Sequence, residues 1–321
     1  MVSHITIREA NTRFSNRQRN DPGRVCVFAG ATSGIGASTL ERLTCVLSSP
    51  TIYIIGRSAK RFAAQQARLY SLNRSCRIVF LQAQVSLLAD VDTVCKKIAN
   101  QERAVDYLFM SPGLIPINGP EYTKEGLEIC FAMSYYARMR LIHNLLPLLR
   151  RSSQPRILSV LNGGKEKQMR DDDIGLEKHW SSLAVVGHSS TMTSLSFDYL
   201  AKQNPKMVFL HTYPGWVKTD NFARLEAPPS SGILWVIFLL LLRSLTGILA
   251  SLFGFSSEQC AERQVFYLTS ERYTPGAWRI DHNSETAGKN RMLDKYRQHG
   301  WPERIWEHTA RVFEKTLFGS R

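Results

Sequence analysis

The sequence predicts an α/β fold, with a doubly wound and mostly parallel sheet that carries helices on both faces. One observation behind this prediction is a short apolar run, Val25 to Ala29, followed by a glycine-rich turn and then by a helical pattern. Another is that further apolar runs alternate with helical segments, which indicates βαβ units. Those runs are Thr51–Ile55, Arg77–Gln82, Val105–Met110, Arg156–Leu161 and Met207–His211, and Tyr273–Ile280 is a turn that leads into the last strand. Residues 24–321 are therefore expected to form one domain, after an N-terminal extension at residues 1–23.

The turn after the first predicted strand contains Gly30, Gly34 and Gly36. The first glycine permits a sharp turn, the second lets backbone N–H groups approach a diphosphate, and the third allows close packing of helix and strand. The helix N-terminus adds partial positive charge. The turn thus indicates a dinucleotide site, to which Thr32, Ser33 and Ile35 also belong. The alternative is a glycine-rich turn that holds no ligand.

The spacing G-x-x-x-G-x-G resembles the first turn of the short-chain dehydrogenase/reductase family, which commonly reads T-G-x-x-x-G-[IL]-G. Ala29 stands where that family usually has Thr. The resemblance runs from about Arg24 to Gly215. It implies a Rossmann-like fold, a nicotinamide cofactor and oxidoreductase activity, and it makes a homodimer an expectation.

The end of the second predicted strand favours NADP over NAD. An acidic residue there binds the ribose hydroxyls of NAD, whereas an Arg accommodates the 2′-phosphate of NADP. This sequence has Arg57 and Ser58 at that position, and no Asp or Glu between Glu41 and Asp90. The alternative is a solvated surface arginine.

Other residues match cofactor-binding positions of the family. Gln84 stands where the family has an Asp that contacts the adenine amino group, and Gly113 ends a Ser-Pro-Gly triplet where the family reads N-A-G. The family's P-G-x-[VI]-x-T loop, which holds the nicotinamide carboxamide, is matched by Pro214, Gly215, Val217 and Thr219.

The family's Y-x-x-x-K unit, in which Tyr transfers the proton and Lys lowers its pKa, is absent, because no Tyr has a Lys four residues on. Gly187 and Thr191 occupy those two positions. Asn162 stands at the position of the catalytic Ser, and it could donate to a substrate oxygen or be a turn residue. Ser134 stands at the position of a structural and catalytic Asn.

Two interpretations of this departure stay open. In one, His188 shuttles the proton near neutral pH, or Tyr135 or Ser134 reaches in from the neighbouring helix, although a lone His is more often structural. In the other, the protein binds NADP without standard carbonyl reduction. It is then an isomerase, cyclase or dehydratase, or a catalytically inactive binding protein.

The composition of the chain limits the kinds of ligand and partner that we expect. The net charge is +14, yet the chain has no nucleic-acid motif, so we expect a small-molecule ligand and no nucleic acid. The six Cys are scattered without a C-x-x-C pair, which predicts neither a metal site nor a disulfide framework and favours a reducing, cytoplasmic compartment.

The segment 228–256 is strongly apolar and contains ten consecutive apolar residues at 233–242. It is predicted to be a lid over a lipophilic substrate or, compatibly, a peripheral membrane contact through 233–255. A helix spanning the bilayer would place Arg243 in its middle. Residues 290–318 are expected to form a C-terminal helical extension that closes one side of the substrate pocket, or a tail packed for stability only.

Four stretches look similar to fungal members of the family from secondary-metabolite clusters. They are Ser-His-Ile-Thr-Ile-Arg-Glu-Ala-Asn-Thr-Arg near the N-terminus, Tyr-Tyr-Ala-Arg-Met-Arg, Gly-Gly-Lys-Glu and Trp-Glu-His-Thr. The expected function is therefore an NADP-dependent oxidoreductase that acts on a hydrophobic carbonyl or alcohol in secondary-metabolite biosynthesis.

Overall fold

The computed structural model describes residues 2–17, 23–219, 227–228 and 231–319. Within these residues the strands form one parallel sheet in the order β3-β2-β1-β4-β5-β6-β7. The strands are β1 Val25–Ala29, β2 Thr51–Gly56, β3 Arg77–Gln82, β4 Tyr107–Met110, β5 Arg156–Val160, β6 Val208–Thr212 and β7 Gly276–Ile280. The predicted doubly wound, Rossmann-like α/β fold is confirmed.

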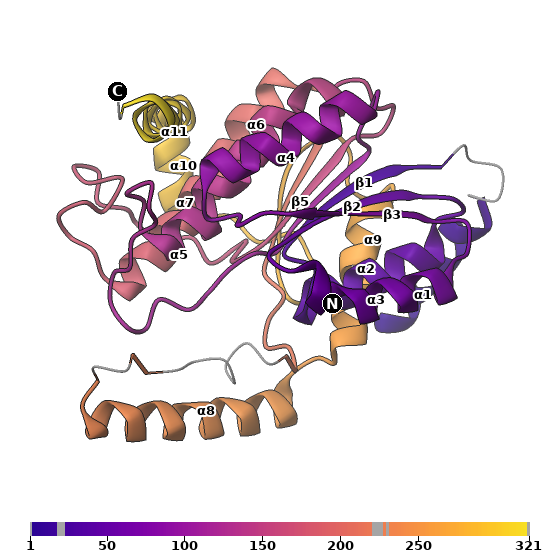
Figure 1. The fold of residues 1–321 in the computed structure, drawn as a ribbon. Coiled ribbons are helices and arrows are strands. Elements are labelled where there is room, and N and C mark those ends of the chain that lie inside the picture. The colour runs from indigo at the N-terminus through magenta and orange to yellow at the C-terminus, as the bar shows by residue number, and fades with distance from the viewer. Residues whose placement is uncertain (1, 18–22, 220–226, 229–230, 320–321) are drawn as a thin grey trace.

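Helices cover both faces of the sheet (Figure 1). One face carries α1 His4–Arg17, α2 Gly34–Val46, α3 Ala59–Leu72 and α9 Ser257–Thr269. The other carries α4 Leu88–Gln101, α6 Ala137–Leu149, α7 Ser182–Gln203, α10 Arg291–Gln298 and α11 Trp301–Phe318. Because both faces are covered, the strands can be apolar along their whole length.

The order of the strands determines where a ligand can bind. The chain leaves β1 for β2 on one side and later returns to place β4 on the other side, so Phe28 of β1 pairs with both Ile54 and Phe109. In open α/β sheets the crevice outside the carboxyl ends of the strands at such a switch point is the ligand site. The glycine-rich turn follows β1 and therefore lies at this crevice.

The long helical segment after β4 begins only at Ile129. Residues 123–127 form a turn, closed by the Thr123 N–H donating to the Leu127 carbonyl at 2.8 Å, with Gly126 at a φ of +80°. Glu128 then accepts from the N–H groups of Cys130 and Phe131 and so caps a helix that starts at Ile129. The helix continues through α5 Ile129–Phe131, a π-helical turn η2 Ala132–Tyr136, and α6.

Both terminal segments pack on the body. In α1, Ile7 is buried and the Asn11 amide donates to Glu262 of α9. On the other face, Trp306 of α11 stacks on Tyr199 of α7 with ring centroids 5.7 Å apart. These contacts match the packed-tail interpretation of residues 290–318; closure of a substrate pocket by them stays a prediction.

The apolar segment forms one continuous 21-residue helix, α8 Ile233–Phe253, which lies apart from the layered body in Figure 1. By length and composition its Ile233–Ala250 stretch is a candidate membrane span, with a mean hydropathy of 2.3. Residues 220–226 and 229–230 beside it lie outside the described residues.

Candidate functional site

The glycine-rich turn is shaped by close backbone approach. Gly30 has a φ of +83°, and a Cβ there would lie 2.4 Å from the nitrogen of Pro112, the residue after Ser111 at the end of β4. A Cβ on Gly36 would lie 2.2 Å from the Gly30 carbonyl oxygen. Only glycine fits either position, so these two residues keep the turn pressed against β4 and the first turn of α2.

The N-terminus of α2 is ready for an anion. Gly34 has a φ of +56° and begins the helix, whose first turn carries no acidic side chain. The Ser33 side chain makes no capping hydrogen bond to the helix, and the first intrahelical donor is Ala37, which bonds the Ser33 carbonyl at 3.3 Å. Among the described residues, the N–H groups of Gly34, Ile35 and Gly36 have no backbone acceptor, and such donors at a helix start suit a diphosphate.

The adenosine end of the crevice is basic. Arg57 follows β2, is exposed, and makes no hydrogen bond or ion pair with any described residue. Ser58 caps α3 by accepting the Arg61 N–H at 3.3 Å, which leaves its hydroxyl proton to donate. Lys60 and Arg61 are also exposed on this first turn. Three cations at one helix N-terminus suit a phosphate monoester.

Gln84, after β3, is held by its backbone. Its N–H donates to the Asp90 carboxylate at 2.8 Å and its amide nitrogen donates to the Ser86 hydroxyl at 3.1 Å. The side-chain carbonyl oxygen is therefore the group of Gln84 that remains to accept a hydrogen bond from an adenine amino group. Thr32 lies closer to β2, since a Cβ on Gly56 would come within 2.9 Å of its methyl carbon.

The predicted nicotinamide loop lies directly over the glycine-rich turn. The Thr219 methyl carbon is 3.6 Å from the Cβ position of Gly34, which joins the end of this loop to the start of α2. Gly215 has a φ of +73°, and Val217 forms a parallel bridge with Phe255. Pro214 directly follows Tyr213, whose N–H bonds the Ile280 carbonyl of β7.

Across the crevice, Gly113 meets nothing within 4 Å of its Cβ position. The backbone after β4 is therefore open toward the same space. The glycine-rich turn, the open backbone at Gly113 and the loop of residues 214–219 are of the kinds that hold a dinucleotide, so the residues present fit that group.

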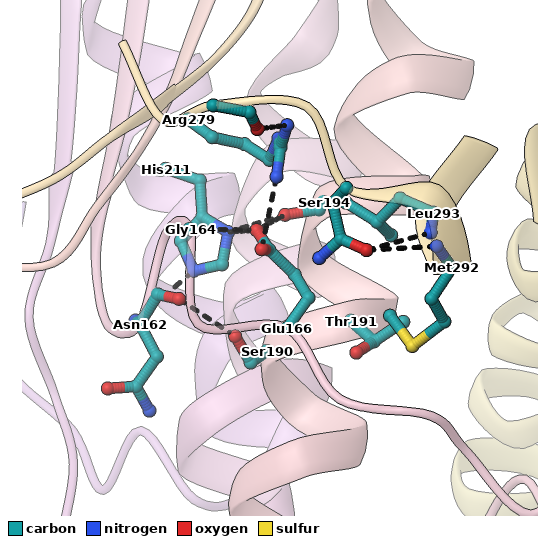
Figure 2. Close-up of polar contacts among 12 residues, drawn as sticks. Asn162, Gly164, Glu166, Ser190, Thr191, Ser194, His211, Arg279, Met292 and Leu293 are labelled. Atoms are coloured by element: carbon teal, nitrogen blue, oxygen red, sulfur yellow. Dashed lines mark hydrogen bonds and ion pairs between the residues drawn. The ribbon is translucent and has the colours of Figure 1, made fainter. Parts of the chain in front are cut away.

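Asn162 lies at the carboxyl end of β5. Its backbone groups are hydrogen-bonded, whereas its side-chain amide is not bonded to any described residue. Its N–H donates to His211 Nε2 at 3.3 Å, and its carbonyl accepts the Ser190 hydroxyl at 3.0 Å. No described residue bonds its side-chain amide, which Figure 2 shows pointing away from the polar cluster behind it. The amide is thus available to donate a hydrogen bond, and donation to a substrate oxygen stays a prediction.

The positions of the family's Tyr and Lys are covered by the chain itself. A Cβ on Gly187 would lie 3.1 Å from the Lys167 Cβ. The Thr191 hydroxyl accepts the Lys167 N–H at 3.0 Å and donates to the Lys167 carbonyl at 2.6 Å. The segment after β5 therefore lies along α7 where the proton relay would stand, and the two α7 residues hold that segment in place.

A buried polar cluster anchors this covering segment from behind (Figure 2). Glu166 Oε1 accepts the Gly164 N–H at 3.0 Å and the Ser194 hydroxyl at 2.7 Å, and its Oε2 pairs with Arg279 of β7 at 3.2 Å. Ser194 also contacts His211 Nδ1 at 2.8 Å. We refer to Glu166, Ser194, His211 and Arg279 as the Glu166 cluster.

Protonation in the Glu166 cluster follows from burial and hydrogen bonds. Burial raises the pKa of Glu166, but the Gly164 N–H, the Ser194 hydroxyl and Arg279 together bring that pKa below its usual value. Burial lowers the pKa of His211 to about 4, so its ring is neutral near pH 7. Its Nε2 accepts from Asn162, so Nδ1 carries the proton and donates to Ser194.

His188, the predicted proton shuttle, is buried in α7. Its Nε2 accepts the Arg170 N–H at 2.9 Å, and its Nδ1 lies 3.1 Å from the Ile174 carbonyl, to which it donates. Burial lowers its pKa, with smaller effects from its neighbours. Both ring nitrogens are thus used to hold the loop that precedes α7, and a catalytic role for His188 stays a prediction without geometric support.

Ser134 and Tyr135 point into packed protein. The Ser134 hydroxyl lies 3.7 Å from Cys130 Sγ, and the Tyr135 hydroxyl bonds Ser196 and Thr309 at 2.7 and 2.6 Å. Burial raises the pKa of Tyr135 well above its usual value. Neither hydroxyl faces the crevice beside Asn162 in these contacts, so their proposed catalytic roles also stay untested predictions.

Sequence reasoning missed Arg138, one helical turn after Ser134. Its guanidinium is buried without a carboxylate partner among the described residues, and burial lowers its pKa to about 9. It donates to the carbonyls of Met110 and Val160 at 3.3 and 2.9 Å, and to that of Pro112. Arg138 therefore ties together the ends of β4 and β5, which frame the crevice. A charge on the inward face of an otherwise apolar helix was the available signal.

Within the described residues, no three His, Cys, Asp or Glu side chains gather as a metal site would require. The fold and the site together define an α/β dinucleotide-binding protein whose catalytic end departs from the usual pattern. The glycine-rich turn, the strand order and the loop over the turn support this class.

Comparison with known proteins identifies the family. The sequence model of the short chain dehydrogenase family matches residues 24–168, which ends before α7. An oxidoreductase of Aspergillus flavus, lepF, is 35% identical, with 91% of this chain and 92% of the relative covered. An oxidoreductase of Emericella nidulans is 33% identical over 99% of both chains. The chain belongs to the short-chain dehydrogenase/reductase family, an oxidoreductase family that binds nicotinamide cofactors.

Solved structures agree on the fold. The crystal structure of an uncharacterized protein from Mycobacterium paratuberculosis superposes with a TM-score of 0.65 at 13% identity, covering 93% of this chain and 96% of that one. At this identity the likeness concerns the fold alone.

Proposed function

We propose that the protein is an NADP-dependent oxidoreductase that acts on a hydrophobic carbonyl or alcohol, in fungal secondary-metabolite biosynthesis. The observation that carries the proposal is the exposed Arg57 at the end of β2, which makes no hydrogen bond or ion pair with any described residue. It accompanies the glycine-rich turn and the loop of residues 214–219, which together we call the cofactor seat. Likeness to fungal oxidoreductases along nearly the whole chain supports the redox class.

The preference for NADP follows from charge. Lys60 and Arg61 add to Arg57 at the N-terminus of α3, and no acidic residue between Glu41 and Asp90 would repel a 2′-phosphate. Arg presents a fork of N–H donors to phosphate oxygens, and such charge-assisted hydrogen bonds are strong. Bound NADPH would supply the hydride; the chain supplies its orientation through the glycine-rich turn and the loop of residues 214–219.

Asn162 is the residue proposed to hold the substrate oxygen. No described residue bonds its side-chain amide, and it follows β5, the strand that pairs with β4. Because Lys167 covers Gly187, a tyrosine relay does not operate at that position. The proton then comes from water or from a group other than His188, whose two nitrogens are committed.

The covered relay position favours a second candidate, a non-redox isomerase, cyclase or dehydratase that keeps the cofactor seat. Consumption of NADPH with lipophilic carbonyl compounds separates the two, because only the redox enzyme consumes it. Metabolite analysis of a deletion strain identifies the substrate, since the compound that accumulates is the one normally consumed.

The cofactor proposal is tested by titrating NADPH and NADH fluorescence against Arg57→Asp. We expect NADPH binding to weaken by roughly tenfold to a hundredfold, about one or two lost charge-assisted hydrogen bonds, with little change for NADH. Arg74→Asp is the matched control. Arg74 is exposed and precedes β3, so it lies at the amino ends of the parallel strands, whereas Arg57 lies at their carboxyl ends. Equal losses for both cofactors would refute Arg57 as the phosphate-binding residue.

A further inference from the structure

The face of α8 that points away from the body is almost entirely apolar. Eight large apolar side chains between Ile233 and Ile248 are exposed, among them Leu234 at 80% and Leu241 at 66%. Among the described residues they make up about half of all exposed large apolar side chains, and the others are spread over the rest of the chain. Such a continuous apolar patch marks an interaction surface.

Two other kinds of helix can be as long and as apolar as a membrane helix, and α8 differs from both in its exposure or its position in the chain. A core helix of a soluble protein is mostly buried, whereas only 11% of the Ile233–Ala250 window is buried. A signal sequence lies near the N-terminus, whereas α8 lies in the last third of the chain. Its mean hydropathy of 2.3 is high enough for a segment in contact with lipid.

The single charge within α8 lies on the other side. Leu239 and Thr246 are buried, and Arg243 is half-buried. These residues are three or four positions apart and so share one face of the helix, the face covered by the protein. Between Ile233 and Ala250, the exposed residues of α8 include no charged residue and one polar residue, Ser244. The helix thus separates its charge from its exposed apolar surface.

Both ends of α8 are fixed to the same body. Near its start, the Trp235 indole donates to the Asn118 side chain at 3.1 Å, in the segment after β4. Just after its end, the Phe255 N–H bonds the Trp216 carbonyl at 2.9 Å, and the Phe255 carbonyl accepts the Lys218 N–H at 3.0 Å. A helix of about 31 Å that spanned a bilayer would put its two ends on opposite sides of the membrane. This one lies along one surface.

From these observations we propose that α8 is an in-plane membrane-docking helix, with the outward face in the headgroup and acyl boundary of a bilayer. A second copy of the chain is the less suitable occupant, because protein interfaces surround an apolar centre with a polar rim. The net charge of +14 adds attraction to anionic lipids. Since Trp216 and Lys218 belong to the predicted nicotinamide loop, docking places the substrate side of the crevice toward the lipid.

The experiment is flotation of protein purified without detergent, on vesicles of phosphatidylcholine with and without phosphatidylserine. The test variant changes the outward face: Leu234→Glu, Leu241→Glu and Ile248→Glu. The matched control changes three exposed apolar residues elsewhere: Ile5→Glu, Leu72→Glu and Phe318→Glu. We expect wild type and control to float, more strongly with phosphatidylserine, and the test variant to lose roughly tenfold or more of its bound fraction.

Three outcomes overturn the proposal. One is equal flotation of the test variant and the control. Another is a wild-type dimer that binds no vesicles and becomes monomeric in the test variant, which assigns the face to a second copy. The third is a wild type that is extracted only with detergent, which makes α8 a spanning helix. NADPH titration of the test variant keeps this result separate from the proposed function, since the cofactor seat is unchanged and binding should persist.

Discussion

Glu166→Gln tests whether the segment over α7 is held by the Glu166 cluster. The substitution keeps size and shape and removes the charge. If the new amide oxygen keeps the bonds to the Gly164 N–H and the Ser194 hydroxyl, the amide nitrogen must face Arg279, which lies 3.2 Å from the present carboxylate oxygen. Two donors then meet in a buried site.

The magnitude follows from those contacts. The lost charge-assisted bond to Arg279 is worth about 1.5–3 kcal/mol, and a buried donor left without an acceptor costs about 1–3 kcal/mol more. We therefore expect the free energy of unfolding to fall by about 3 kcal/mol, the size seen when one member of a buried pair is removed. Urea unfolding followed by far-UV circular dichroism measures it, with an unchanged m-value.

Glu177→Gln is the matched control, because Glu177 also pairs with a cation, Lys315 at 3.4 Å, but on the exposed surface. Its effect should be close to zero. Equal unfolding free energies for Glu166→Gln and Glu177→Gln would show that the Glu166 cluster does not stabilise the covering segment, and the reasoning about that segment would be wrong.

Three further predictions follow from the same contacts. Arg138→Met removes the donor to the carbonyls at the ends of β4 and β5 and should lower the free energy of unfolding, measured in urea, by at least about 3 kcal/mol. An unchanged free energy of unfolding would contradict the inference that Arg138 ties these two strand ends together. Gly187→Tyr with Thr191→Lys should lower the unfolding free energy and not increase NADPH consumption, because the first collides with Lys167 and the second removes its backbone bonds. The pKa of His211 is about 4 in the folded state, below its ordinary 6.5, so between these two pH values the unfolded chain binds one more proton than the folded chain. The neutral His211 ring therefore contributes fully to the free energy of unfolding above pH 6.5. About 3 kcal/mol of that contribution is lost as the pH falls toward 4. His211→Gln should flatten that part of the stability profile in urea titrations at several pH values, and an unchanged slope would refute the assignment.

The fold and the positions of the candidate cofactor-binding residues could be predicted because each depends on a short, continuous stretch of sequence. The position of Gly30 after a five-residue apolar run, and of Arg57 after the second run, needs only the strand-turn-helix pattern. The structure adds the reason that Gly30 and Gly36 are required, which is the approach of Ser111 and Pro112 from β4. Binding by those residues stays a prediction.

The catalytic end could not be predicted because its signals are not local. The titration range of a histidine favours His188 as a proton shuttle, but no pattern in the sequence shows that both its nitrogens bond the backbone at Arg170 and Ile174. Glu166 and Arg279 are 113 residues apart and meet only because β7 lies beside β6. The inward position of Arg138 on its helix is a local signal, but its carbonyl partners at Met110 and Val160 belong to other elements and are not visible in the sequence.

The departures at Gly187 and Thr191 are coupled to the segment that covers them. With 3.1 Å between the Lys167 Cβ and the Cβ position of residue 187, a side chain as large as Tyr has no room while the segment is in place. Thr191 in turn bonds both backbone groups of Lys167, and Tyr296 of α10 accepts the Met169 N–H. The missing proton relay is therefore replaced by packed, hydrogen-bonded structure. Within the described residues, the side-chain amide of Asn162 is the polar group at the end of β5 that this packing leaves without a partner.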